Sequence, residues 1–230
     1  MTYWIFALAI AAAYVLGSIP FGLLIVKAYG KDLRAIGSGN IGATNVARAL
    51  GRKWAYVCFA LDLLKGLVPT LAASILVSRS SNIDEPVLGR VEGHQLVLWL
   101  WLAVGCAAVL GHIFPVYLRF KGGKGVATSF GVALGLWPYY TVSAAAAGAV
   151  WVVVVLIWRY VSLASIAAAV TFPIVLFASV ILIPGWNLST LWPLLIVATI
   201  IPLMVIVRHR ENVKRLLAGT ESKILKGKKS

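Results

Sequence analysis

Long apolar runs dominate this sequence of 230 residues and limit what it can fold into. A run of about 20 apolar residues is long enough to cross a bilayer as a helix. Hydrophobic residues make up 61% of the chain and charged residues 12%, whereas soluble domains are roughly half apolar and a quarter charged. The sequence therefore predicts an all-α integral membrane protein, with one membrane-embedded domain over residues 1–230. The apolar runs cover residues 3–26, 54–77, 96–118, 126–157, 161–183 and 191–207.

The cationic residues indicate which ends of the spans face the cytoplasm. The net charge is +14, and Lys and Arg cluster at residues 27–53, 119–124 and 208–229. Such clusters beside apolar spans mark the cytoplasmic side, which places the N-terminus outside and makes residues 221–230 a basic cytoplasmic tail. The tail ends inside if residues 126–157 form two short helices that turn near Trp137-Pro138, which gives a seven-helix bundle. Five spans, with a re-entrant segment near the C-terminus, are the alternative.

Polar residues inside the apolar runs indicate which helix faces point into the bundle. Pro20 removes a helical N–H and breaks or kinks the first run. Irregular backbone at membrane depth is tolerated where protein covers it, so we expect Ser18 to face the interior. Asp62 and Lys65 are three residues apart and share a helix face, which predicts a buried ion pair. His112 is expected near the inner surface as a packed or snorkelling residue, with a catalytic role as the alternative.

Residues 37–52 form the first candidate motif, at a membrane surface between two apolar runs. Glycines let a ligand approach backbone N–H groups closely, short polar side chains donate hydrogen bonds, and arginine offers a planar cationic fork. Together these groups suit a phosphate. The alternative is a hairpin whose arginines only follow membrane topology. The candidate binding residues are Gly37, Ser38, Gly39, Asn40, Thr44, Asn45 and Arg48.

The second candidate motif is the run Lys121-Gly122-Gly123-Lys124 before an apolar segment. We expect its N–H and ammonium groups to hold a phosphate at a helix N-terminus. Its likeness to a Walker A loop is superficial, because the upstream glycine and the parallel-sheet pattern are missing.

The third candidate motif follows the last span, where His209 and Asn212 share a face of a short interfacial helix. Gly219 is a suitable residue to end that helix. A basic juxtamembrane helix without catalysis is the alternative. Ser162, at another helix start, is expected to cap its helix or to contact substrate.

Taken together, these stretches resemble the acyl-phosphate-dependent glycerol-3-phosphate acyltransferase family of bacteria. The likeness spans nearly the whole chain in the expected order. It also includes Ser18-Ile19-Pro20-Phe21-Gly22 and the pair Asp62 and Lys65 before Gly66. The residues that carry it are Gly37-Ser38-Gly39-Asn40, Gly42-Ala43-Thr44-Asn45, Arg48, Lys121-Gly122-Gly123-Lys124-Gly125-Val126-Ala127-Thr128, His209, Asn212, Leu216, Gly219 and Glu221.

The resemblance implies transfer of a fatty acyl group from acyl phosphate to the 1-hydroxyl of glycerol 3-phosphate, giving lysophosphatidic acid and phosphate. It further implies a seven-helix fold in the bacterial inner membrane, with the active site on the cytoplasmic face and neither metal nor coenzyme A. His209 and Asn212 would bind the glycerol phosphate. Membrane lipids are the remaining expected partners, and no nucleic acid is expected.

The residues themselves suit this chemistry. Acyl phosphate is already activated, so the site must position two anions and stabilise charge on the carbonyl oxygen and the leaving phosphate. We assign these tasks to the loop N–H groups, Ser38, Arg48 and one or both of Lys121 and Lys124. The candidate catalytic residues are Ser38, Arg48, Lys124 and His209, and His209 and the acyl-phosphate oxygen are alternative acceptors of the hydroxyl proton. The His-x4-Asp pattern of coenzyme A-type enzymes is missing, since no Asp follows His94, His112 or His209 at that spacing. A membrane transporter of an organic phosphate is the alternative function, although no inverted repeat is visible.

Overall fold

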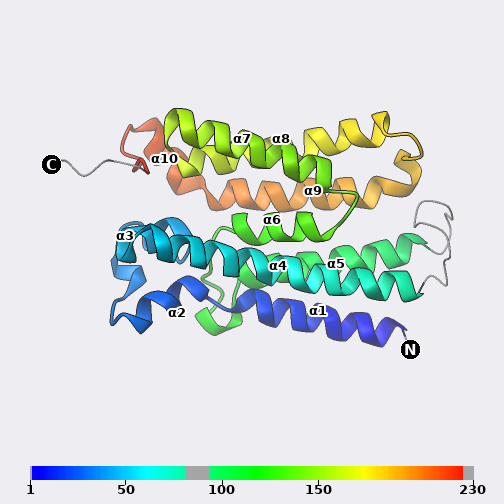
Figure 1. The fold of residues 1–230 in the computed structure, drawn as a ribbon, viewed down its shortest axis with the longest axis horizontal. Coiled ribbons are helices and arrows are strands. Elements are labelled where there is room, and N and C mark those ends of the chain that lie inside the picture. The colour runs from blue at the N-terminus through cyan, green and yellow to red at the C-terminus, as the bar shows by residue number, and fades with distance from the viewer. Residues whose placement is uncertain (1, 81–93, 225–230) are drawn as a thin grey trace. The chain divides into compact units, whose positions relative to one another are not determined.

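The computed structural model describes residues 2–80 and 94–224 (Figure 1). Most of the predicted outer loop at 78–93, and the tail beyond residue 224, lie outside the described residues. The chain divides into two compact units, Met1–Trp137 and Pro138–Ser230, which are described separately below. Whether they act as the single catalytic domain expected from the sequence stays a prediction.

The first unit is a set of helices in which the first apolar run is interrupted. α1 ends at Ser18 and α2 begins at Phe21, so the predicted break around Pro20 is confirmed. The Ser18 side chain is buried, as expected, and donates to the Tyr14 carbonyl oxygen at 2.8 Å. The elements of this unit are α1 (Thr2–Ser18), α2 (Phe21–Ala28), η1 (Leu33–Ala35), α3 (Ala43–Leu50), α4 (Arg52–Ser80), α5 (His94–Ile113), η2 (Val116–Leu118) and α6 (Val126–Gly135).

Glycines let two helix pairs of this unit pack with their backbones close together. α1 packs on α5, and α4 packs on α6. A Cβ at Gly66 would meet the Thr128 carbonyl oxygen, and a Cβ at Gly131 would meet that of Leu63. Helices in membranes use small residues in this way, because van der Waals packing and not water exclusion drives their association. α6 is thereby held against the α4 segment that carries Asp62 and Lys65.

The second unit contains α7 (Thr141–Trp158), α8 (Val161–Leu182), α9 (Leu188–Arg208) and α10 (Arg210–Leu217). α7 packs on α8, and α8 packs on α9. Gly219 has φ +68°, the left-handed conformation that commonly follows a helix end. The predicted stop of the last helix at this glycine is confirmed.

Six described helical segments are long and apolar enough to cross a membrane: residues 4–28, 52–78, 95–118, 141–158, 161–182 and 188–208. The predicted division of residues 126–157 is confirmed, because α6 ends at Gly135 and α7 begins at Thr141. α6 has 10 residues and is about 15 Å long, half of a typical hydrocarbon core of about 30 Å. The seven predicted helices thus correspond to six full-length segments and one short helix. The sidedness of the termini stays a prediction.

Candidate functional site

The Asn45 side chain organises the first glycine motif. Asn45 lies in α3 and is 1% exposed. Its Nδ2 donates to the carbonyl oxygens of Leu33 at 3.0 Å and Ile36 at 2.9 Å. Its Oδ1 accepts from the Ser38 N–H at 3.2 Å and from Arg48 Nη1 at 3.4 Å. Because an amide has two donor hydrogens and two acceptor sites on its oxygen, these contacts occupy the whole group, and Asn45 acts inside the loop.

The rest of the first motif is folded around this amide. Gly37 has φ +55°, and a Cβ there would lie 2.6 Å from Asn45 Oδ1 and 2.8 Å from Arg48 Cδ. Asn40 Oδ1 accepts from the N–H of Gly42, the residue that precedes α3, at 3.0 Å. Ser38 and Arg48 stay exposed. The loop therefore presents a hydroxyl and a guanidinium on a frame fixed by its asparagines.

The second glycine motif is tied to the C-terminal end of α5. The Gly122 N–H donates to the Ile113 carbonyl oxygen at 3.2 Å, and the Gly123 N–H donates to that of His112 at 3.1 Å. We expected such N–H groups to face a phosphate, but these two satisfy the last carbonyls of a helix. The glycines are needed instead for space, since a Cβ at Gly122 would meet the His112 carbonyl oxygen. Lys124 is half-buried and stands two residues before α6 begins.

A hydrogen bond joins η1, just before the first motif, to the second motif. Arg34 Nη2 donates to the Lys121 carbonyl oxygen at 2.9 Å, over a sequence separation of 87 residues. The structure therefore places the first two motifs in one unit, whereas the predicted convergence of all three motifs stays a prediction. It places Ser38, Arg48, Lys121 and Lys124 in that unit, whereas Ser162, His209 and Asn212 belong to the second.

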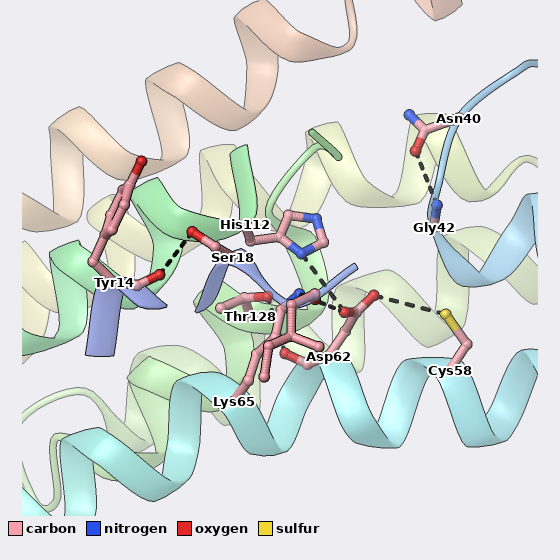
Figure 2. Close-up of polar contacts among 10 residues, drawn as sticks. Tyr14, Ser18, Asn40, Gly42, Cys58, Asp62, Lys65, His112 and Thr128 are labelled. Carbon is pink, nitrogen blue, oxygen red and sulfur yellow. Dashed lines mark hydrogen bonds and ion pairs between the residues drawn. The ribbon is translucent and has the colours of Figure 1, made fainter. Parts of the chain in front are cut away.

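A buried charged cluster lies beneath the second motif. Asp62 Oδ1 is 2.7 Å from Lys65 Nζ and 3.7 Å from His112 Nδ1, and the predicted Asp62–Lys65 ion pair is confirmed. Figure 2 shows Asp62 between Lys65, His112 and Cys58. Helical spacing indicated the Asp–Lys pair, but nothing in the sequence connected it to His112, which comes from α5.

In the second unit, the Glu221 carboxylate accepts hydrogen bonds from two side chains of the third motif and from Ser162. Its Oε1 accepts from Ser162 Oγ at 2.7 Å and from Asn212 Nδ2 at 2.6 Å, and its Oε2 accepts from Arg215 Nε at 2.7 Å. Partial burial raises the pKa of Glu221, but these hydrogen bonds and the Arg215 charge outweigh it, so the pKa lies below its ordinary value. The arrangement holds α8 and α10 together through one carboxylate.

These contacts change the expected role of Ser162. Tyr160 and not Ser162 occupies the N-cap position of α8. The expectation that Ser162 caps this helix is wrong, because its hydroxyl donates to Glu221 instead. His209 is buried, and its Nδ1 is 2.7 Å from the Val205 carbonyl oxygen one turn earlier. Sequence reasoning kept Glu221 only as part of a resemblance and gave Arg215 no role. Their separation of six residues, across the end of a helix, has no recognised pairing pattern.

Comparison with known proteins gives a consistent assignment. The family model described as glycerol-3-phosphate acyltransferase matches residues 7–219. A glycerol-3-phosphate acyltransferase of Geotalea daltonii is 46% identical over 93% of this chain and 94% of its own length. One of Aquifex aeolicus is 43% identical over 91% and 94%.

Two crystal structures of PlsY, an integral membrane glycerol 3-phosphate acyltransferase, are also similar. The glycerol 3-phosphate form has a TM-score of 0.76 and 42% identity and covers 95% of each chain. The lysophosphatidic acid form has a TM-score of 0.73 and 41% identity, over 95% of this chain and 94% of the other. With its glycine motifs, charged cluster and membrane helices in the matched region, this chain belongs to the glycerol-3-phosphate acyltransferase family.

Proposed function

We propose that this protein transfers a fatty acyl group from acyl phosphate to the 1-hydroxyl of glycerol 3-phosphate, releasing lysophosphatidic acid and inorganic phosphate. The observation that carries the proposal is the match over 95% of both chains to a glycerol 3-phosphate acyltransferase in its glycerol 3-phosphate form. The related lysophosphatidic acid form corresponds to the product. The family assignment favours this enzyme over the transporter of an organic phosphate.

The choice of acyl phosphate as donor comes from the resemblance to the acyl-phosphate-dependent family, and this chain's own residues suit that donor. An acyl phosphate carries its own leaving group, so the acceptor hydroxyl can attack without a protein nucleophile. Such a reaction needs contacts that orient both phosphates and donors toward the carbonyl oxygen in the transition state. Ser38 and Arg48 on the first motif, with Lys121 and Lys124 on the second, have the hydroxyl, guanidinium and ammonium groups that suit these tasks.

Most other candidate residues have supporting roles in this proposal. Gly37, Gly39, Gly122 and Gly123 shape the two loops, Asn40 and Asn45 hold the first loop, and Thr44 lies in the first turn of α3 beside it. His209 and Asn212 bind the glycerol phosphate. The hydrogen bonds from Ser162 and Asn212 to Glu221 hold the Asn212 side chain in its orientation. Neither metal nor coenzyme A takes part. We further propose that the site faces the cytoplasm in a bacterial inner membrane.

The decisive assay supplies purified protein with palmitoyl phosphate and labelled glycerol 3-phosphate and measures labelled lysophosphatidic acid. Product with palmitoyl-CoA or acyl carrier protein, and none with palmitoyl phosphate, would reject the donor assignment. Ser38→Ala, Arg48→Ala, Lys124→Ala and His209→Ala should each lower turnover about tenfold or more, the loss of one charge-assisted contact. Normal turnover in all four variants would mean that the site is elsewhere.

Sidedness needs a separate test. Cysteines introduced at Ser80, which ends α4, and at Ser222 should react with a membrane-impermeant thiol reagent from opposite faces of the membrane. The native Cys58 is buried. Replacement of the half-buried Cys106 by Ala provides the background for labelling. Labelling of both positions from the same face would contradict the proposed topology.

A further inference from the structure

We propose that the buried cluster of Asp62, Lys65 and His112 positions the segment from Gly123 to Thr128, and thereby sets how tightly the enzyme binds a phosphate substrate. The proposal rests on the proposed function, because that function gives Lys124, within this segment, a phosphate to bind. None of the three residues needs to contact substrate. Their effect passes through backbone and packing contacts to the segment.

Burying these polar and charged side chains inside a membrane protein costs free energy. Asp62, Lys65 and His112 are 4%, 6% and 5% exposed. Buried ion pairs gain little stability over well-packed apolar residues, and charged groups within membrane segments usually have a function. A role beyond filling space is therefore the better account of a buried Asp62 carboxylate that approaches both Lys65 and His112.

The segment from Gly123 to Thr128 is attached to the cluster at both ends. At its start, the Gly123 N–H donates to the His112 carbonyl oxygen at 3.1 Å. At its end, Thr128 Oγ1 donates to the Asp62 carbonyl oxygen at 2.9 Å. The two acceptor carbonyls thus belong to cluster residues whose side chains approach each other at 3.7 Å. That contact between α4 and α5 fixes the spacing of the two anchors, with Lys124 between them.

Packing adds a second constraint at Gly123. A Cβ at this glycine would meet the His112 ring, with Nε2 as the nearest atom. The ring therefore lies directly against the backbone of the loop. A change in the orientation of the ring would move the residue immediately before Lys124.

Lys65 links the cluster to the interrupted first run of the chain. Its Nζ donates to the Ile19 carbonyl oxygen at 2.8 Å, between α1 and α2. It also lies over the Phe21 ring, 5.6 Å from the centroid. The position of α4 is thereby tied to the break around Pro20 as well as to the loop. Three elements distant in sequence are joined through the Asp62 carboxylate and its partners.

The first test is His112→Asn, which keeps an amide nitrogen near the place of Nδ1 but removes the ring edge beneath Gly123. We expect the KM for glycerol 3-phosphate or for palmitoyl phosphate to rise tenfold or more, while the melting temperature changes little. A purely structural role would instead lower kcat through loss of folded protein and leave both KM values unchanged. That result would overturn the proposal.

A second variant covers the case in which His112→Asn fails to fold. Asp62→Asn combined with Lys65→Met removes both charges together, so no uncompensated ion stays buried. It should also raise one KM tenfold or more. Thr70→Val is the matched control. It removes a buried hydroxyl from α4, and that hydroxyl donates to the Gly66 carbonyl oxygen one turn earlier in the same helix. Both KM values of this control should stay within twofold of wild type.

A readout independent of turnover separates this proposal from the proposed function. Backbone hydrogen exchange at Gly122 and Gly123 should accelerate at least tenfold in the cluster variants and stay unchanged in Thr70→Val. Unchanged exchange in the cluster variants would overturn the positioning role even if the wild type is active. Absence of product from the wild type, with accelerated exchange in the variants, would reject the proposed reaction and retain the positioning role.

Discussion

Replacement of Asn45 by Ala tests most directly how the first motif is held in shape. The change removes a long contact from Arg48 Nη1, at 3.4 Å, and three shorter hydrogen bonds: two to carbonyl oxygens, at 3.0 and 2.9 Å, and one from the Ser38 N–H, at 3.2 Å. The three shorter bonds set the estimate. At about 1 kcal/mol each, the loss is about 3 kcal/mol. About 1.4 kcal/mol corresponds to a factor of ten. The population of the ordered loop relative to disordered forms would therefore fall by a factor of about 100.

Other hydrogen bonds still stabilise the ordered loop and offset part of this loss in free energy. The Gly39 N–H still donates to the Ile36 carbonyl oxygen, and Arg34 still bonds the Lys121 carbonyl oxygen. We therefore expect kcat/KM to fall at least about tenfold, a smaller effect than the full shift of the loop equilibrium. Hydrogen exchange of residues 36–42 should accelerate in parallel, because the same bonds protect those amides.

The assay compares lysophosphatidic acid formation by Asn45→Ala with that of Asn187→Ala. Asn187 is a matched control, because its side chain accepts from the Thr190 N–H and caps α9 in the second unit. Loss of a cap costs about 1 kcal/mol, so this control should lose some stability and keep its kcat/KM. Normal kcat/KM and normal exchange in Asn45→Ala would refute the account of the loop given above.

Three further outcomes are expected. Arg34→Met, which breaks the exposed bond from η1 to the second motif, should lower kcat/KM severalfold, since one such bond contributes about 1 kcal/mol. Gly131→Ala places a Cβ against the Leu63 carbonyl oxygen and should destabilise the protein by about 1–3 kcal/mol, measured by thermal unfolding. The pKa of Glu221 is lowered in the folded state, so its stabilising effect is present above the unfolded value of about 4.3 and is lost as the pH falls through the folded value. The melting-temperature advantage of wild type over Glu221→Gln should therefore shrink below about pH 4.

Local patterns were sufficient to predict the long apolar helices and several of their ends, but not α3, which lies within the first glycine motif. Pro20 and Trp137-Pro138 marked breaks that the structure contains, and Gly219 marked the end of the last described helix. These features depend on residues adjacent in the chain, so a sequence displays them directly. The Asp62–Lys65 pair was predictable for the same reason, because residues three apart on a helix face each other.

The roles of the glycines and polar residues within the motifs were harder to predict from the sequence. Composition indicated a phosphate site, but the N–H groups of Gly122 and Gly123 are used by α5, and the Asn45 amide is used inside its own loop. Ser162 was expected to cap its helix, yet it bonds Glu221 from a distance of 59 residues. Residue type indicates which bonds a group can make, whereas the partner depends on which segments the fold brings alongside.

The sequence by itself determined that this chain is a helical membrane protein, because apolar runs of that length must satisfy their backbone hydrogen bonds internally in lipid. It also determined the family, because three motifs occur together in the right order. Only the tertiary structure decided that His112 reaches Asp62 from another helix and that Thr128 and Gly123 are anchored on the same pair of residues. Those contacts depend on close approach between helices at glycines such as Gly66 and Gly131. The order of residues along the chain does not show which helix faces pack against each other.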